Sequence, residues 1–371
     1  MPTVYTSFII AAFGALMISF TNLKKLNRLT FLLLLFFIIA ITGLRSEYVG
    51  TDSLQYYLTF KELNNMALTH AYATRYAIGY VSWTRFIGSF IDSPYAFFFI
   101  TASITLSIYF YFLRRYSVNV FSSIIVFFCL NWTLYMVAMR QAYAMMFVLL
   151  GVPFLLKRKL IFFILFVIIA MQFHSAAITA LFLIPLLKIE LNKKSIAIFC
   201  GVTIFLFFSM NILWLLVRTF GGAYAQYMAG DYDVGGTNFI NDIIIKIMPS
   251  LFIFCLGYWG SKNNASIENH FFLTVCLFNI CIAVIGLNSV IFTRLNGYFD
   301  FANPIVFSYF LASKQIKKFS VRSLTLLALF LFVAFFTVIQ IARPEWMKIS
   351  PYSPFWSPVN EYGLYATQYF W

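Results

Sequence analysis

Long apolar runs recur along the whole chain, and they constrain its fold more than any other feature. Hydrophobic residues make up 62% of the 371 positions, and only 10% are charged, against about 25% in soluble proteins. Backbone N–H and C=O groups in lipid must bond within the protein, so runs of this kind form helices. They are continuous rather than alternating, which argues against membrane-spanning strands. The sequence therefore predicts an all-α, polytopic transmembrane helical bundle, with residues 1–371 forming a single membrane domain.

Basic residues indicate how the chain crosses the membrane. The formal net charge of +14 could indicate nucleic-acid binding, but Lys and Arg gather in the short cytoplasmic loops of membrane proteins. Lys24, Lys25 and Arg28 follow the first apolar run, so we place this turn inside and the N-terminus outside. Continuing along the chain predicts about 12 spans, with both termini external and most basic residues inside. The predicted spans are residues 4–20, 29–44, 94–113, 118–137, 140–156, 160–171, 175–187, 195–217, 240–259, 271–287, 291–311 and 323–341.

Three external segments follow from this topology. Residues 45–93 form a long loop whose part 76–91 is amphipathic, and we expect it to lie at the membrane interface. The alternative is that residues 76–91 span, which would invert everything downstream. Residues 218–239 form a Gly-rich loop, and residues 342–371 form an aromatic, proline-rich tail.

Motifs for a metal or cofactor site are missing from the sequence. The five cysteines all lie within apolar runs and have no CxxC or CxxH spacing, so we interpret them as small buried hydrophobic residues. There is no P-loop, zinc spacing or EF-hand pattern, and His174-Ser175 is not part of a GxSxG elbow. We therefore expect no metal and no cofactor.

Three arginines lie on the predicted external side, although Lys and Arg usually gather in cytoplasmic loops. Arg45, Arg140 and Arg294 each lie at or just within the external end of a predicted helix. A central charge costs about 2.5 to 3.5 kcal/mol there and usually marks a functional site, although snorkelling to the headgroups is the alternative. The guanidinium is planar, stays charged and binds pairs of oxygens. Arginines converging on one face would suit a lipid-linked diphosphate at the outer leaflet.

Polar and aromatic residues accompany these arginines. Gln141 follows Arg140, Tyr298 follows Arg294 by four positions, and Tyr56 lies in the first external loop. Such groups hold sugar hydroxyls and stack on pyranose faces. The alternative for each tyrosine is the aromatic belt found at both membrane interfaces.

Three titratable residues are candidates for proton transfer. Asp52 and Glu62 are the preferred carboxylates for accepting a proton from a hydroxyl nucleophile. Asp52 could instead cap the helix that begins near Ser53, since Asp is a favoured N-cap residue. His174 lies where two short apolar runs meet. It could be a satisfied core residue, a phosphate contact or a proton shuttle.

Several motifs together resemble the EpsG family, which belongs to the Wzy-type polymerases. Arg45, Val49, Gly50, Asp52 and Tyr56 fit the signature R-x(3)-V-G-x-D-x(3)-Y that follows the second span in that family. The further matches, in chain order, are MRQAYAMMFVLL from Met139, FHSAA from Phe173, RLNGYF from Arg294 and the segment 352–354. The resemblance covers nearly the whole chain, and the long tail after Arg343 departs from it.

The resemblance implies a function that composition does not. Such polymerases are glycosyltransferases that join undecaprenyl-diphosphate-linked oligosaccharide repeats at the periplasmic leaflet of the bacterial inner membrane, as in O-antigen assembly. Arg45, Arg140 and Arg294 would then bind the diphosphate, with Asp52 or Glu62 as the base and without a metal. The expected partners are the lipid-linked oligosaccharide and membrane lipid, a chain-length regulator is left open, and nucleic acid is not expected. The alternatives are a flippase or other transporter of the same repeat, an O-antigen ligase, and a structural scaffold.

Overall fold

The computed structural model describes residues 24–72, 76–209, 243–261, 266–288, 290–312 and 352–356, with single residues at 11, 14, 215, 219, 335 and 348. The chain divides into two compact units. The first unit comprises residues 1–178 and 323–371, and the second unit comprises residues 179–322. Within the described ranges the regular structure is helical, and the one β contact is an isolated bridge between Arg45 and Pro354.

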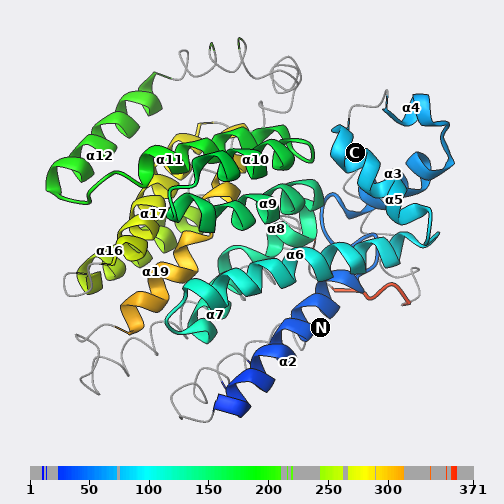
Figure 1. The fold of residues 1–371 in the computed structure, drawn as a ribbon, viewed down its shortest axis with the longest axis horizontal. Coiled ribbons are helices and arrows are strands. Elements are labelled where there is room, and N and C mark those ends of the chain that lie inside the picture. Colours follow the sequence, from blue (N-terminus) through cyan, green and yellow to red (C-terminus); the bar gives the residue numbers. More distant parts are fainter. Residues whose placement is uncertain are drawn as a thin grey trace. The chain divides into compact units, whose positions relative to one another are not determined.

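The first unit is built from three long apolar helices, α2, α6 and α9, and several shorter ones, some of them grouped at one end (Figure 1). Its helices are α2 (Lys24–Gly43), α3 (Ser53–Asn65), α4 (Leu68–Tyr72), α5 (Ile78–Gly88), α6 (Pro94–Tyr116), α7 (Val120–Leu130), α8 (Trp132–Val137), α9 (Met139–Leu156) and α10 (Leu160–Met171). The 3-10 helix η1 (Ser175–Phe182) contains the boundary with the second unit.

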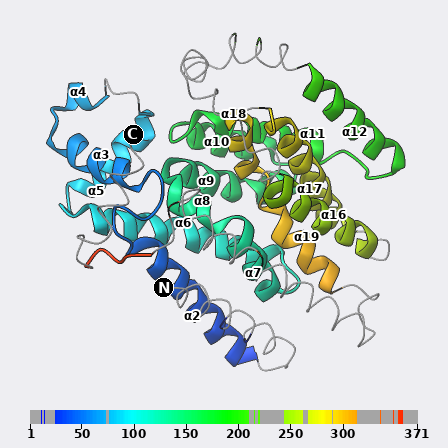
Figure 2. The same ribbon diagram turned by 180° about the vertical axis from the view of Figure 1, so that it is seen from behind.

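Close helix approach organises the first unit. Helix α6 packs against α2 on one side and α9 on the other, and α9 packs against α10. At Gly43 a Cβ atom would lie 2.7 Å from the Cα of Phe99, so only glycine lets the end of α2 approach α6 this closely. Figures 1 and 2 show the described tail segment, in red, beside this end of α2. The C-terminal end of α2 is therefore the place where the first loop, α6 and the tail meet.

The second unit is a smaller helical cluster around α17. Its elements are α11 (Leu183–Leu186), α12 (Lys193–Phe208), the π-helix η3 (Ile243–Ile247), α16 (Met248–Ser261), α17 (Ile267–Gly286), α18 (Val290–Thr293), the 3-10 helix η4 (Arg294–Tyr298) and α19 (Ala302–Leu311). Helices α16, α17 and α19 pack on one another, and α11 and α12 pack on α17. Among them, buried Asn303 donates to the Ser250 hydroxyl at 3.1 Å and accepts from the Cys276 thiol at 3.0 Å. This polar cluster joins three helices in an otherwise apolar core.

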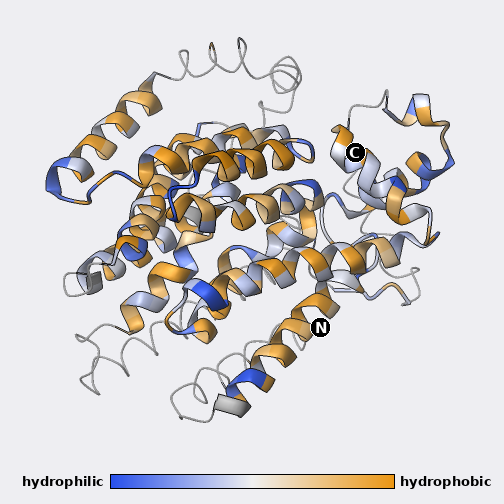
Figure 3. Ribbon diagram, in the orientation of Figure 1, coloured by the Kyte–Doolittle hydropathy of each residue, from blue (hydrophilic) through white to orange (hydrophobic). Residues whose placement is uncertain are grey.

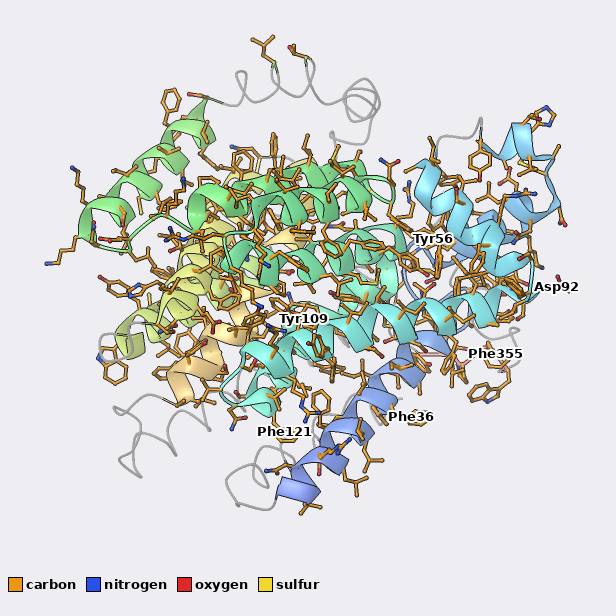
Figure 4. All side chains as sticks on the ribbon, viewed as in Figure 1. Phe36, Tyr56, Asp92, Tyr109, Phe121 and Phe355 are labelled. Atoms are coloured by element: carbon orange, nitrogen blue, oxygen red, sulfur yellow. The ribbon has the colours of Figure 1, made fainter. Side chains whose placement is uncertain are left out.

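Large apolar side chains on the outside of the helices indicate that lipid surrounds them. Figure 3 shows long stretches of hydrophobic ribbon in both units. Phe36, labelled in Figure 4, is 65% exposed on α2, and Ile161 is 74% exposed on α10. In water such surface would be costly, whereas lipid is as apolar as these side chains. The protein is therefore an all-helical membrane protein.

Four helices in the described part of the chain are long and apolar enough to cross a membrane. They are Leu26–Gly43, Pro94–Tyr116, Met139–Leu156 and Ile267–Gly286, and each overlaps a predicted span. Shorter apolar helices occupy the predicted spans at 160–171 and 175–187, which meet at Phe173-His174 as expected. The predictions for residues 4–20, 218–239 and 323–341 fall outside the described ranges. The number of about 12 spans and the external termini stay predictions.

Two of the predicted spans are broken rather than continuous. Asn131 separates α7 from α8 in the stretch 118–137, and Asn has a low helix propensity. The stretch 291–311 consists of α18, η4 and α19, with a turn at residues 299–301. Pro304 explains this second break, because proline in a continuous helix would remove a backbone hydrogen bond. The chain instead places Pro304 in the first turn of α19, where its missing N–H costs nothing.

Helix α5 lies within the amphipathic segment 76–91. It has 11 residues, which at 1.5 Å per residue is about 17 Å, well short of the 30 Å or so of a bilayer core. Its buried residues Tyr80, Val81, Thr84 and Ile87 face the protein, and it packs on α3. This short length is compatible with an interfacial helix, and the position of residues 76–91 at the membrane interface stays a prediction.

We expect cysteine labelling to place the first loop and the C-terminal end of α6 on opposite sides of the membrane. Glu62 and Arg115 are both exposed, and Arg115 is at the far end of α6 from the first loop. In a background without the five native cysteines, Glu62→Cys should react with an impermeant maleimide on intact cells. Arg115→Cys should react only after permeabilisation. Labelling of both from outside would contradict the predicted topology.

Candidate functional site

The candidate site lies in the first unit, at the loop between α2 and α3. Arg45 is 1% exposed, and its guanidinium reaches three parts of the chain. Its Nε donates to the Ser53 hydroxyl at 3.1 Å, and one terminal nitrogen donates to the carbonyl of Met136 at 2.8 Å. The other terminal nitrogen donates to the carbonyl of Thr42. Arg45 therefore links the end of α2, the start of α3 and the end of α8.

Aromatic rings complete the enclosure of Arg45. Its guanidinium lies 4.5 Å from the centroid of the Phe98 ring, an arrangement that stabilises a cation. Burial lowers the pKa of Arg45 to about 10, and the nearby tyrosines Tyr352 and Tyr56 oppose that change. The side chain stays protonated at neutral pH. A buried cation held by carbonyls and a ring forms a fixed support for the loop.

The C-terminal tail pairs with the same loop. Ser46 N–H donates to the carbonyl of Ser353 at 2.8 Å, and Phe355 N–H donates to the carbonyl of Leu44 at 2.9 Å. Gly50 N–H donates to the carbonyl of Lys348 at 2.8 Å, and Gly50 has a φ of +100°, a conformation that favours glycine. The segment 352–354, which resembled a family motif, is thus fixed beside Arg45.

Arg140 lies in a group of tyrosines at the start of α9. It is half-buried, and its guanidinium lies 5.2 Å from the centroid of the Tyr76 ring. It also hydrogen-bonds Tyr56 of α3. Burial raises the pKa of Tyr56, the charge of Arg140 lowers it, and the nearby Asp52 raises it. The structure therefore brings together three of the predicted site residues, Arg140, Tyr56 and Asp52, and Figure 4 labels Tyr56 in this group.

A second layer holds this group in place. The hydroxyl of Tyr76 lies 2.9 Å from the hydroxyl of Thr59 and accepts from the Gln55 amide at 3.1 Å. The ring of Tyr80 lies 5.8 Å from that of Tyr76 and 6.2 Å from that of Tyr56. Sequence reasoning missed Tyr76, Tyr80, Gln55 and Thr59. The four-residue spacing of Gln55 and Thr59 was the one available signal, since it places them on one face of a helix.

The two candidate carboxylates lie in different places. Asp52 is the N-cap residue of α3, but it makes no side-chain capping hydrogen bond. Asp52 therefore occupies the position that the capping alternative expected, but without the side-chain bond, and the charge of its exposed carboxylate acts on Tyr56. Glu62 is exposed ten residues further along α3, about 15 Å away at 1.5 Å per residue. Asp52 and Glu62 thus do not act on one atom together.

His174 and Gln141 flank the tyrosine group. Half-buried His174 lies in the turn between α10 and η1, and the carbonyl of Gln172 in that turn accepts from Tyr80 N–H at 3.2 Å. Phe173 beside it packs on the Tyr143 ring at 5.4 Å. Gln141 is 4% exposed, so it faces the protein interior rather than the surface. The turn that carries His174 is therefore fixed to the same group of elements.

The remaining predicted residues belong to the second unit. Arg294 begins η4 and is exposed, whereas Tyr298 at its end is 1% exposed. The expected convergence of Arg294 with Arg45 and Arg140 stays a prediction. In the described ranges, no group of three or more His, Cys, Asp or Glu side chains is arranged to hold a metal ion.

The comparison with protein families covers most of the chain. The model of the EpsG family matches residues 28–353, from α2 to the tail segment beside Arg45. The chain belongs to the EpsG family. EpsG is a family of Wzy-like polymerases, so this EpsG chain is a membrane-bound, glycosyltransferase-like polymerase of exopolysaccharide or O-antigen repeat units. No curated protein and no solved structure matches it.

We expect Arg45 of this EpsG-family chain to contribute strongly to the stability of the folded protein. Arg45→Ala leaves the carbonyls of Thr42 and Met136 without their donor, and each stranded buried group costs about 1–3 kcal/mol. The purified protein should therefore unfold at a clearly lower temperature in detergent. Exposed Arg115 supplies the control, since surface substitutions change stability by about 0.5 kcal/mol or less. An unchanged unfolding temperature for Arg45→Ala would contradict this role.

Proposed function

We propose that the chain joins undecaprenyl-diphosphate-linked oligosaccharide repeats at the outer leaflet of the bacterial inner membrane, with its active face in the periplasm. One observation carries the proposal: half-buried Arg140 lies against Tyr56 and Tyr76, with the exposed carboxylate of Asp52 beside them. A cation and a carboxylate that both act on Tyr56 suit a reaction that needs both an anion site and a base. The family membership supports the same reaction class.

The reaction can be written with these groups. A hydroxyl of the acceptor repeat attacks the anomeric carbon of the growing chain, and a new C–O bond forms there. The bond from the anomeric carbon to the diphosphate oxygen breaks, and undecaprenyl diphosphate leaves with the bonding electrons. The hydroxyl proton goes to the Asp52 carboxylate, whose charge acts on Tyr56.

Arg140 suits the leaving group. Negative charge grows on the diphosphate as the bond breaks, and a fixed cation aimed at that charge lowers the barrier. The guanidinium presents a planar fork that binds two phosphate oxygens at once, whereas the ammonium of Lys is a point charge. The ring of Tyr76 and the hydroxyl of Tyr56 limit the movement of Arg140 before substrate arrives.

We assign the other predicted residues to positioning and binding roles around this reaction. Arg45 is sealed from solvent, so we assign it to positioning the loop rather than to touching the diphosphate. We keep exposed Arg294 as a phosphate-binding residue of the second unit, and buried Tyr298 and Gln141 as groups that shape their surroundings. His174, half-buried beside the tyrosine group, is assigned to a phosphate contact or proton relay.

Removing Arg140 should abolish polymer formation. In a deletion strain complemented with Arg140→Ala, gels of the surface polysaccharide should show single repeats instead of a ladder, since losing one such donor costs about 10²–10³ in rate. Arg140→Lys should rescue poorly because it lacks the fork. Arg115→Ala, a change at an exposed arginine at the far end of α6, is the matched control and should keep the ladder.

The banding pattern also separates the proposal from its alternatives. Loss of even the single repeats in Arg140→Ala would indicate a flippase or ligase defect instead of a polymerase defect. Full activity of Arg140→Lys would remove the argument from the bidentate fork.

We expect Asp52→Asn to slow chain elongation far more than Glu62→Gln does. Loss of a general base costs about 10²–10⁴ in rate, and Asp52 is the carboxylate beside Arg140 and Tyr56. The measurement is the rate of repeat addition by purified protein in nanodiscs. The opposite order of the two variants would move the base to Glu62.

A further inference from the structure

Four aromatic rings form a continuous strip next to the Arg45 loop. We call Tyr57, Tyr95, Phe355 and Trp356 the aromatic strip. Tyr57 of α3 and Tyr95 of α6 have ring centroids 5.3 Å apart, Tyr95 and Phe355 are 5.1 Å apart, and Phe355 and Trp356 are 5.0 Å apart. Figure 4 labels Phe355, which lies beside the start of α6. Three distant parts of the chain thus contribute to one aromatic surface.

The strip is exposed where the tail contributes to it. Phe355 is 40% exposed and Trp356 is 65% exposed, whereas Tyr57 and Tyr95 are half-buried. The exposed rings sit on a backbone that is fixed, because Phe355 N–H bonds to Leu44 and the Ser353 carbonyl accepts from Ser46. Large apolar rings held rigidly at a surface are typical of a binding site, since little entropy is lost when a ligand stacks on them.

Polar groups border the aromatic strip on the side of α3 and the loop. The Glu47 carboxylate is 8% exposed and accepts from the Tyr95 hydroxyl at 2.8 Å. The ammonium of Lys61 lies 4.4 Å from the centroid of the Tyr57 ring and covers that face. The rings available to a ligand are therefore those of Tyr95, Phe355 and Trp356, with a carboxylate at their edge.

This combination matches the surface of a sugar ring. A pyranose presents C–H groups on its face and hydroxyls around its rim. The C–H groups carry partial positive charge that the negative face of an aromatic ring attracts, and the hydroxyls donate to a carboxylate. Spacings of about 5 Å between rings are close to the length of one sugar unit in a chain.

We propose that the aromatic strip binds the saccharide chain of the substrate, as a subsite next to the Arg140 group. The proposal rests on the proposed function, since it supplies that reaction with a place to hold the sugar part of a lipid-linked repeat. Membrane lipid is the rival occupant. The Glu47 carboxylate argues against it, because a buried anion repels phosphate headgroups and favours neutral hydroxyl-rich ligands.

The test compares two aromatic residues of equal exposure. Trp356 in the aromatic strip and Phe36 on the exposed face of α2 are both 65% exposed. With the lipid-linked repeat as substrate, Trp356→Ala should raise KM about tenfold, as expected for loss of one stacking contact, with kcat nearly unchanged. Phe36→Ala should change neither value. Trp356→Phe, which keeps a ring, should give an intermediate KM.

A binding measurement separates this proposal from the polymerase assignment. The probe is the oligosaccharide released by mild acid from the strain's own polysaccharide, added to the Arg140→Ala protein in nanodiscs. It should bind, and Trp356→Ala in the same background should bind about tenfold more weakly. Equal binding by both proteins would overturn the proposal, whatever Arg140→Ala does to polymer formation. Quenching of Trp356 fluorescence by brominated lipids, with KM unchanged in Trp356→Ala, would overturn it in favour of a membrane anchor.

Discussion

The buried guanidinium of Arg45 is the interaction on which the first unit depends. A cation taken out of water must be compensated from every side, and here carbonyls, a hydroxyl and an aromatic face do so. Those partners come from α2, α3, α6 and α8. Because the guanidinium is planar and its donors point in fixed directions, satisfying them all fixes the relative positions of these elements. A loop that leaves the membrane is thereby given one conformation.

The position of Arg140 follows from that constraint. Met136, whose carbonyl binds Arg45, lies one residue before the end of α8, and α9 begins at Met139. Arg45 therefore holds the chain just before the turn that aims Arg140 toward Tyr56 and Tyr76. The proposed function gives the two arginines separate tasks for a physical reason. A cation that is fully enclosed cannot also reach a ligand, so positioning goes to Arg45 and binding to half-buried Arg140.

The sequence predicts most helices here because lipid makes continuous apolar runs sufficient evidence for them. It names Arg140, Tyr56 and Asp52 as candidate site residues from their charge, their chemistry and their predicted position outside the lipid, but it does not predict that these three meet. It could not predict Tyr76, since this residue reaches the site from a loop after α4 and no local pattern fixes a loop's path. Asn131 and Pro304 are local signals for a helix break. They are weak beside the high hydropathy of the surrounding runs, which led to the prediction of continuous spans.

The tail shows how a proline-rich segment can be fixed without forming a sheet. Arg45 and Pro354 face each other at a position of the antiparallel pair that exchanges no hydrogen bonds, and the bonds come from the residues on either side. Pro354 lacks an N–H and loses nothing there, whereas a proline at the next position would remove the bond that Phe355 N–H donates to Leu44. Side chains alternate along an extended segment, so fixing this register also fixes which way Phe355 projects. The same few backbone bonds that brace the Arg45 loop therefore determine where the exposed aromatic rings lie.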